Sequence, residues 1–167
     1  MKVIPMDTEI RKADQTEITV IIETLQRTIR ASFTGFLGEE EVGSFIESGG
    51  VERFATEYLD AMEVLLLNGV IIGFVVTKEN AIDLLMVDCD HHGNGYGSRL
   101  LEHAENELFE KFDQLRVDSF RDNTGANSFY QIHGWIEEKE FFDPEYGIPM
   151  KRFAKSRGAE RSSRRVD

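Results

Sequence analysis

The first long pattern of apolar and polar positions lies in residues 15–32. Apolar residues recur there every three or four positions, at Ile18, Ile21, Ile22, Leu25 and Ile29. This spacing places them on one side of a helix and predicts an amphipathic helix over residues 15–32. Asp14 or Thr16 is suited to cap its start. The preceding segment, Thr8–Ala13, reads as a short strand.

Glycines interrupt the segment that follows, residues 33–59. They stand among acidic and aromatic residues at positions Gly35, Gly38, Gly43, Gly49 and Gly50. Glycine is unfavourable inside helices and strands and is frequent in turns. The segment is therefore predicted to form loops around one or two short helices.

Apolar runs of strand length come next. Met62–Leu67 and Val70–Thr77 are separated by the pair Asn68-Gly69. Asn-Gly is the preferred pair for a tight two-residue turn, so the two runs predict a β-hairpin. A third strand, Ala81–Val87, follows a turn at residues 78–80.

Beyond residue 98 the pattern alternates between helical and extended segments. Leu101, Ala104, Leu108 and Phe112 share one face of a predicted helix at Arg99–Phe112. We then expect a strand at Leu115–Phe120, a helix at Ala126–His133 ended by Gly134, and strands at Trp135–Phe142 and Met150–Phe153. The order of elements indicates an α+β protein.

Composition favours a single domain. The chain has 167 residues, of which 41% are hydrophobic, enough for one sizeable core. Its single cysteine, Cys89, has no partner for an internal disulfide, and the sequence shows no signal-peptide pattern. The longest apolar stretch, residues 64–76, is shorter than the roughly 20 residues that cross a bilayer. We expect a cytoplasmic protein that does not bind membranes.

Charge is distributed unevenly along the chain. The formal net charge is -12, although seven basic and only two acidic residues lie from Lys151 onward. The acidic body should repel nucleic acid. Residues 156–165 have no apolar face and are expected to be disordered. We therefore expect one domain at residues 1–154 and a basic tail at residues 155–167.

A glycine-rich loop joins the third strand to the next helix. The segment Val87-Asp88-Cys89-Asp90-His91-His92-Gly93-Asn94-Gly95-Tyr96-Gly97-Ser98 has three glycines at alternate positions. Glycines permit close backbone approach, and the N–H groups at a helix start attract anions, so the layout suits phosphate binding. It fits neither Gly-x-Gly-x-x-Gly of dinucleotide sites nor the loop of triphosphate sites, which ends in Gly-Lys-Ser/Thr.

The same loop resembles the acetyl-CoA loop of the GNAT superfamily of N-acetyltransferases, Arg/Gln-x-x-Gly-x-Gly/Ala. Residues 92–97 match both of its glycines, with His92 in the place of Arg or Gln. A second resemblance lies downstream, at residues 123–135. The superfamily pattern Asn-x-x-Ala-x-x-Phe-Tyr-x-x-x-Gly-Phe is matched there at every named position except the last, where Trp135 replaces Phe.

The resemblance implies a GNAT-like fold and acetyl-CoA as co-substrate. The expected fold is an α/β three-layer arrangement, a mixed and mostly antiparallel sheet of six to seven strands with about four helices. A backbone N–H near Val87 would stabilise the oxyanion, and the amides of residues 93–98 would take the pyrophosphate. The residues implied in binding acetyl-CoA are Met86, Val87, His92, Gly93, Asn94, Gly95, Tyr96, Gly97, Ser98, Asn123 and Tyr130.

The resemblance implies that Tyr130 is the general acid. A phenol with a pKa of about 10 stays protonated at neutral pH and is able to donate to a departing thiolate. Its spacing with Ala126, Phe129 and His133 equally suits an aromatic residue of the core. Asn123 would contact the pantetheine arm, cap its helix, or do both.

The expected base is Asp83, in the strand before the loop. The position where relatives usually carry a glutamate falls at Ala81, so Asp83 is either a base acting directly or through water, or a solvent-facing strand residue. The ammonium of the acceptor would otherwise meet one of four acids, Glu39, Glu40, Glu41 or Asp88.

His92 introduces a titratable group where the superfamily has Arg or Gln. Histidine loses its charge near neutral pH, so its help to acetyl-CoA binding should weaken between about pH 6 and 8. The four histidines lack metal-ligand spacing with each other or with cysteine, and we expect no metal. Cys89 has no supporting triad and is not expected to be a nucleophile.

Two functions follow from the resemblance. The first is an N-acetyltransferase that moves an acetyl group from acetyl-CoA to a primary amine of a small molecule or peptide by direct attack. The second is a catalytically weak GNAT-like module that binds acyl-CoA or a protein partner. The acidic body either favours a cationic acceptor, such as a polyamine, an aminoglycoside-like amine or a basic peptide, or serves solubility. Relatives are often homodimers, which the sequence also allows.

Overall fold

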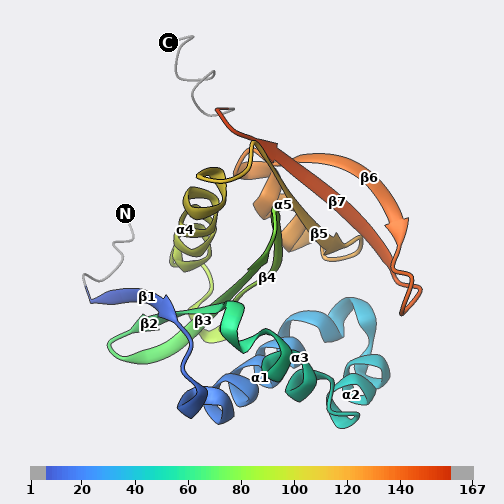
Figure 1. Ribbon diagram of the computed structural model, residues 1–167. Coiled ribbons are helices and arrows are strands. Elements are labelled where there is room, and N and C mark those ends of the chain that lie inside the picture. Colours follow the sequence, from blue (N-terminus) through green and yellow to red (C-terminus); the bar gives the residue numbers. More distant parts are fainter. Residues whose placement is uncertain (1–6, 159–167) are drawn as a thin grey trace. The chain divides into compact units, whose positions relative to one another are not determined.

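A computed structural model describes residues 7–158, which form a seven-stranded sheet in the order β1-β2-β3-β4-β5-β7-β6 and five α-helices (Figure 1). The strands β4 and β5 pair in parallel, whereas the pairs β1–β2, β2–β3, β5–β7 and β6–β7 are antiparallel. The predicted α+β fold with a mixed, mostly antiparallel sheet is confirmed, with one helix more than expected.

The strands are β1 (Thr8–Lys12), β2 (Met62–Leu67), β3 (Val70–Lys78), β4 (Ala81–Val87), β5 (Gln114–Phe120), β6 (Ile136–Phe142) and β7 (Pro149–Ser156). The helices are α1 (Ile18–Leu37), α2 (Glu39–Glu47), α3 (Gly50–Tyr58), α4 (Tyr96–Phe109) and α5 (Thr124–Ile132). The described residues divide into two compact units, one containing residues 7–77 together with 84–102, the other residues 78–83 together with 103–158.

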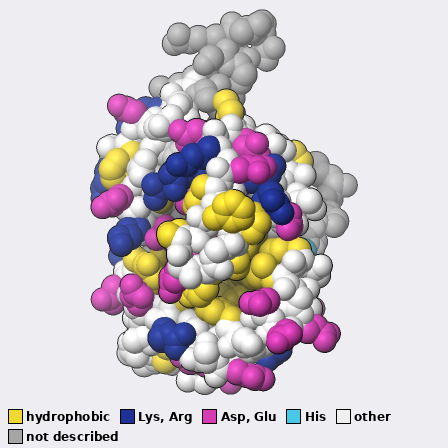
Figure 2. Space-filling model, turned by 90° about the vertical axis from the view of Figure 1, so that its right-hand side faces the viewer, with side chains coloured by type: hydrophobic (Ala, Val, Ile, Leu, Met, Phe, Trp, Pro, Cys, Tyr) yellow, Lys and Arg dark blue, Asp and Glu magenta, His cyan; other side chains and the backbone are white. Residues whose placement is uncertain are grey.

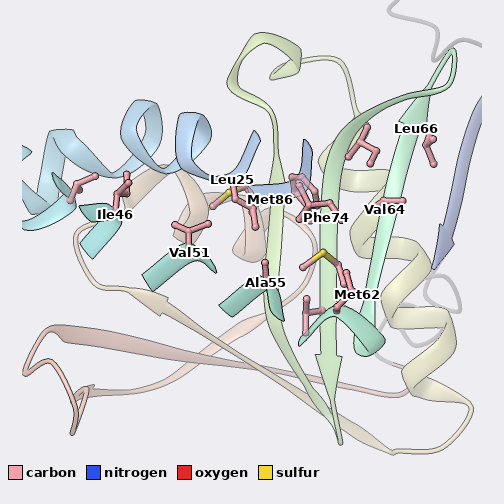
Figure 3. Packing of buried hydrophobic residues seen from close by; sticks show 14 residues of the cluster. Leu25, Ile46, Val51, Ala55, Met62, Val64, Leu66, Phe74 and Met86 are labelled. Carbon is pink, nitrogen blue, oxygen red and sulfur yellow. The ribbon is translucent and has the colours of Figure 1, made fainter. Parts of the chain in front are cut away.

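The first unit contains a core built from the helices α1, α2 and α3 and the strands β2, β3 and β4. Figure 3 shows the side chains of this core, among them Leu25, Val51, Phe74 and Met86. Phe74 is fully buried. Ile21 and Leu25, from the apolar stripe expected on the first helix, are buried in this core. The 3.6-residue period of α1 places them on the same side of the helix, which faces the core.

The hairpin of β2 and β3 is confirmed. Asn68 and Gly69 have φ values of 52° and 78°, the left-handed conformation that a tight turn of this kind requires. Gly73 on β3 is needed for another reason, because an added Cβ would lie 2.9 Å from the Leu100 side chain and 3.2 Å from the Met86 carbonyl oxygen. Any larger residue would push α4 away from this strand.

The segment between residues 33 and 59 is more helical than predicted. The first helix continues to Leu37, and α2 and α3 follow with breaks only at Gly38 and at residues 48–49. Gly38 has φ of 91° and Gly49 has φ of 81°, so each ends a helix where another residue type would be strained. The other glycines of the segment lie within helices, which is why composition alone suggested loops.

The second unit is built on β5, β7 and β6. The side chains of Val117 and Phe153 are directly paired across β5 and β7 and are buried. The ring of Tyr130, on α5, packs against Phe153 and Trp135, with ring centroids 5.9 Å apart in both pairs. Gly134 ends this helical segment with φ of 87°, as expected from its position.

A buried ion pair joins three elements of the second unit. The Lys155 ammonium on β7 donates to the Glu105 carboxylate on α4 and, at 2.8 Å, to the carbonyl oxygen of His133 at the end of α5. The side chains of Lys155 and Glu105 are 4% and 10% exposed. Because β7 runs to Ser156, it passes the expected domain boundary at residue 154; residues 159–167 of the expected tail lie outside the described residues.

Charged side chains of both signs are interspersed on the surface drawn in Figure 2. Across β6 and β7, Lys151 pairs with Glu137 at 2.6 Å and with Glu140 at 3.8 Å. No helix among residues 7–158 combines the length and apolar content that crossing a bilayer requires.

Candidate active site

The glycine-rich loop lies in the first unit, between β4 and α4. The N–H of Asp88, the first residue after β4, donates to the Ile72 carbonyl oxygen of β3 at 2.8 Å. The hydrogen bonding between β3 and β4 therefore continues to the first residue of the loop. A short 3₁₀ turn follows at Cys89–His91. Gly93 and Gly95 then adopt φ values of 76° and 86°, accessible at little strain only to glycine.

The fourth helix begins three residues earlier than predicted, at Tyr96. Its first backbone bond runs from the Arg99 N–H to the Gly95 carbonyl oxygen, 3.1 Å. The N–H groups of Tyr96 and Gly97 thus belong to the first turn, where amides have no acceptor within the helix. These amides and the helix dipole attract an anion, so the backbone fits the predicted pyrophosphate contact.

The side chain of His92 closes the loop onto the preceding strand. Its Nε2 atom lies 2.6 Å from the carbonyl oxygen of Val87, so the ring donates a hydrogen bond to the backbone. Nδ1 is the ring nitrogen left for a ligand. The expected contribution of His92 to phosphate binding remains a prediction, and the structure adds a role in shaping the loop.

The side chains of Asn94 and Tyr96, also in the loop, contact other residues of the protein. The Asn94 amide lies 3.3 Å from the His92 carbonyl oxygen and 3.4 Å from that of His91. Tyr96 is 5% exposed, and its ring lies 6.3 Å from the ring of His91. The side chains of Asn94 and Tyr96 are therefore engaged by the protein itself.

Asp88 is held by an ion pair that the sequence did not reveal. Its buried carboxylate pairs with the Arg27 guanidinium of α1 and accepts the Asp90 N–H at 3.1 Å. Burial raises the pKa of Asp88, but the Asp90 N–H and the charge of Arg27 outweigh it and hold the pKa below its ordinary value. Asp88 is therefore occupied and is a poor candidate for the acceptor's ammonium.

The replacement Asp88→Asn should lower stability in a pH-dependent way. A carboxyl with a depressed folded-state pKa stabilises the protein above its unfolded pKa, about 3.9, and loses that effect as the pH falls through the folded value. At pH 7 we expect a loss of about 1 kcal/mol, because Arg27 is partly exposed. Urea unfolding of both proteins at pH 7 and at pH 3 checks this; an equal difference at both pH values would contradict it.

Two acids and the thiol of the loop lie close together. Asp88, Cys89 and Asp90 offer ligand atoms within 4.8 Å of one another, but Arg27 already occupies Asp88. Burial and the two neighbouring carboxylates raise the pKa of the Cys89 thiol. A thiol with a raised pKa is a weak nucleophile.

In the second unit, Asn123 and Tyr130 lie on one helical segment. The Asn123 side chain accepts the Ala126 N–H at 3.2 Å and caps α5, which confirms the capping interpretation; its contact with pantetheine stays a prediction. Tyr130 lies two turns further on and is 6% exposed. Burial raises the pKa of its phenol, so the group stays protonated far above neutral pH.

Asp83 and Tyr130 lie on opposite faces of the sheet in the second unit. In the pairing of β4 with β5, Ile82 lies opposite Val117, so the next residue, Asp83, shares a face of the sheet with Asp118. Val117 lies opposite Phe153 of β7 and points to the other face. Tyr130 packs against Phe153 and therefore lies on that other face. Burial raises the pKa of Asp83, partly offset by the charges of Lys78 and Arg116. The two groups predicted as base and acid are therefore not neighbours on one surface.

The GNAT acetyltransferase family matches residues 23–135. No curated protein sequence matches the chain. Among solved structures, a GCN5-related N-acetyltransferase from Rhodopseudomonas palustris superposes with a TM-score of 0.79 at 21% identity, covering 92% of this chain and 98% of that chain.

Two further structures share the fold. The PaiA N-acetyltransferase from Thermoplasma acidophilum, solved with coenzyme A, has a TM-score of 0.70 at 22% identity, covering 88% of this chain and 98% of the other. The ribosomal-protein-S18-alanine N-acetyltransferase from Escherichia coli has a TM-score of 0.67 at 19% identity, with 89% and 93% covered. With the family match over most of the chain, these likenesses lead to one conclusion: the chain belongs to the GNAT family of acetyltransferases.

Proposed function

We propose that this protein transfers an acetyl group from acetyl-CoA to a primary amine of a small molecule or peptide. The observation that carries the proposal is the start of α4, where first-turn amides follow two glycines in left-handed conformation directly after a sheet strand. Relatives described as N-acetyltransferases support nitrogen as the acceptor atom.

In this proposal the loop residues hold the co-substrate through their backbone. The amides of residues 93–98 take the pyrophosphate, and the end of β4 at Met86 and Val87 aligns the pantetheine arm and supplies an N–H for the carbonyl oxygen. His92 keeps the loop folded through its bond to the Val87 carbonyl. Acetyl-CoA supplies an activated acetyl thioester.

Proton transfers are assigned to two side chains. Tyr130 donates a proton to the departing sulfur, and burial keeps its phenol protonated at neutral pH. Asp83, on the opposite face of the sheet from Tyr130, accepts the proton of the amine, directly or through water, and burial raises its pKa towards the range useful for a base. Asn123 fixes the helix that carries Tyr130.

Acetylation is tested with acetyl-CoA and a panel of amines, amino acids and short peptides. We expect release of the free CoA thiol together with a product heavier by one acetyl group on nitrogen, identified by mass spectrometry. Binding of CoA without product in any reaction would instead support the binding module.

A matched pair of glycine variants controls for loop integrity. Gly95→Val should abolish CoA binding, because φ of 86° strains a β-branched residue and the side chain covers the amides. Gly158→Val imposes comparable strain at φ of 83°, where an added Cβ meets nothing within 4 Å, and should bind CoA normally. Equal binding by both variants would contradict the assignment of the loop.

A further inference from the structure

An open pocket of about 190 Å³ lies within the second unit, on the face of the sheet that carries Asp83. Its walls come from β4, β5, the end of β6 and the start of β7, and are formed by Ala81, Ile82, Asp83, Arg116, Asp118, Phe141, Asp143 and Met150. Charged groups of both signs therefore line a space that also has an apolar wall.

Two of the three carboxylates in the pocket are already used by the protein. Asp118 receives two hydrogen bonds from the Arg152 guanidinium, at 2.8 and 3.0 Å. Asp143 accepts the N–H groups of Glu145 and Tyr146 at 2.9 and 2.7 Å and shapes the turn between β6 and β7. The remaining carboxylate belongs to Asp83.

Arg116 is the unexplained cation of the pocket. Arg116 is partly buried on β5 and lines the pocket, and among residues 7–158 no carboxylate pairs with it. Asp83 also has no ion-pair partner in this part of the chain, although Arg116 is near enough to lower its pKa electrostatically. An unpaired charge that is partly removed from water is unfavourable unless a ligand completes it.

The opposite charges of Arg116 and Asp83 indicate which chemical groups a ligand of this pocket should carry. A guanidinium binds a carboxylate through two parallel hydrogen bonds, and a free carboxylate binds an ammonium group. A molecule carrying both groups satisfies Arg116 and Asp83 at once. A simple cation leaves Arg116 without an anion, and a simple carboxylate leaves Asp83 without a cation.

We propose that the acceptor of this acetyltransferase is an amino acid, bound with its carboxylate on Arg116 and its amino group on Asp83. The inference rests on the proposed function and narrows its substrate class. A cavity of about 150 Å³ holds a benzene molecule, so this pocket accommodates a small or medium side chain. Phe141 and Met150 supply the apolar wall for it.

The chemistry balances with the groups named. The ammonium gives one proton to Asp83, which passes it to water, and the neutral amine attacks the acetyl carbon. The bond from that carbon to sulfur breaks as the bond to nitrogen forms. Tyr130 protonates the thiolate that leaves, and the second proton lost by nitrogen passes through water and restores the Tyr130 phenol. Arg116 takes part only by positioning the substrate.

The test compares amino acids with their primary amides, which keep the amino group and lose the negative charge. Wild-type protein should have a KM for the amino acid about tenfold to a hundredfold lower than for its amide, since bonds to a charged group are involved. Arg116→Gln should remove this difference by raising KM for the amino acid alone. Arg121→Gln, an exposed arginine paired with Asp122, is the control and should behave as wild type.

Binding measured by calorimetry in the presence of CoA gives a second readout, independent of turnover. Amino acids should bind to wild type and to Arg121→Gln, and at least tenfold more weakly to Arg116→Gln. Acetylation of amines and amides without preference for the carboxylate, or failure of every amino acid to bind, would overturn the inference while leaving the proposed acetyl transfer intact. Absence of any acetylated product would instead overturn the proposed function.

Discussion

The replacement Tyr130→Phe is expected to lower kcat for acetyl transfer by about two to four orders of magnitude, the usual effect of removing a general acid. The ring of Tyr130 packs against Trp135 and Phe153, and phenylalanine preserves those contacts. Affinity for CoA and the unfolding midpoint should therefore change little. Turnover is followed by the release of free thiol and CoA binding by calorimetry.

Tyr58→Phe provides the matched control. Tyr58 packs against Phe54 on α3 in the first unit and has no assigned part in the chemistry. It should retain wild-type kcat. Unchanged turnover in Tyr130→Phe would remove Tyr130 from the mechanism, whereas a joint loss of turnover and CoA affinity would point to a binding role.

The second large effect is expected from Lys155→Met. This change leaves the Glu105 carboxylate buried without its cation and removes the hydrogen bond to the His133 carbonyl oxygen. Breaking a buried ion pair by removing one partner typically costs about 3–5 kcal/mol. We expect a loss near the lower end of that range in the free energy of unfolding, measured by urea denaturation with circular dichroism.

Two variants make the interpretation specific. The double variant Lys155→Met with Glu105→Leu should recover most of the lost stability, because no charge is left buried. Lys151→Met, on the same strand, removes a more exposed pair with Glu137 and should cost less than about 1 kcal/mol. A double variant as unstable as the single one would show that packing by Lys155, not its charge, is what matters.

Much of the fold could be predicted because its signals are local. The hairpin follows from the pair Asn68-Gly69, whose left-handed conformations serve a two-residue turn. The helices of residues 33–59 could not be read in the same way. Gly38 ends a helix with φ of 91°, whereas Gly43 lies inside one, and the residue type alone does not distinguish the two.

In the candidate site, too, some features follow from local sequence and others depend on residues far apart in the chain. The backbone of the glycine loop follows from its spacing, whereas the partner of Asp88 is Arg27, 61 residues earlier in the chain. No local pattern reveals such a pair. The relation of Asp83 to Tyr130 likewise depends on the register of β4, β5 and β7, which decides the face of each side chain. The sequence identifies Asp83 and Tyr130 as candidate catalytic residues, but only the strand pairing shows on which face of the sheet each side chain lies.

Trp135, which stands where the superfamily pattern has phenylalanine, is the only tryptophan in the chain. It is 2% exposed, its ring meets that of Tyr130 edge-on at 63°, and its indole N–H has no acceptor among the described residues. All tryptophan emission of the protein therefore arises beside the proposed acid. The residue is a built-in fluorophore, and light absorbed by Tyr130 is able to reach it by energy transfer, so tryptophan emission reports on the surroundings of Tyr130 without a label.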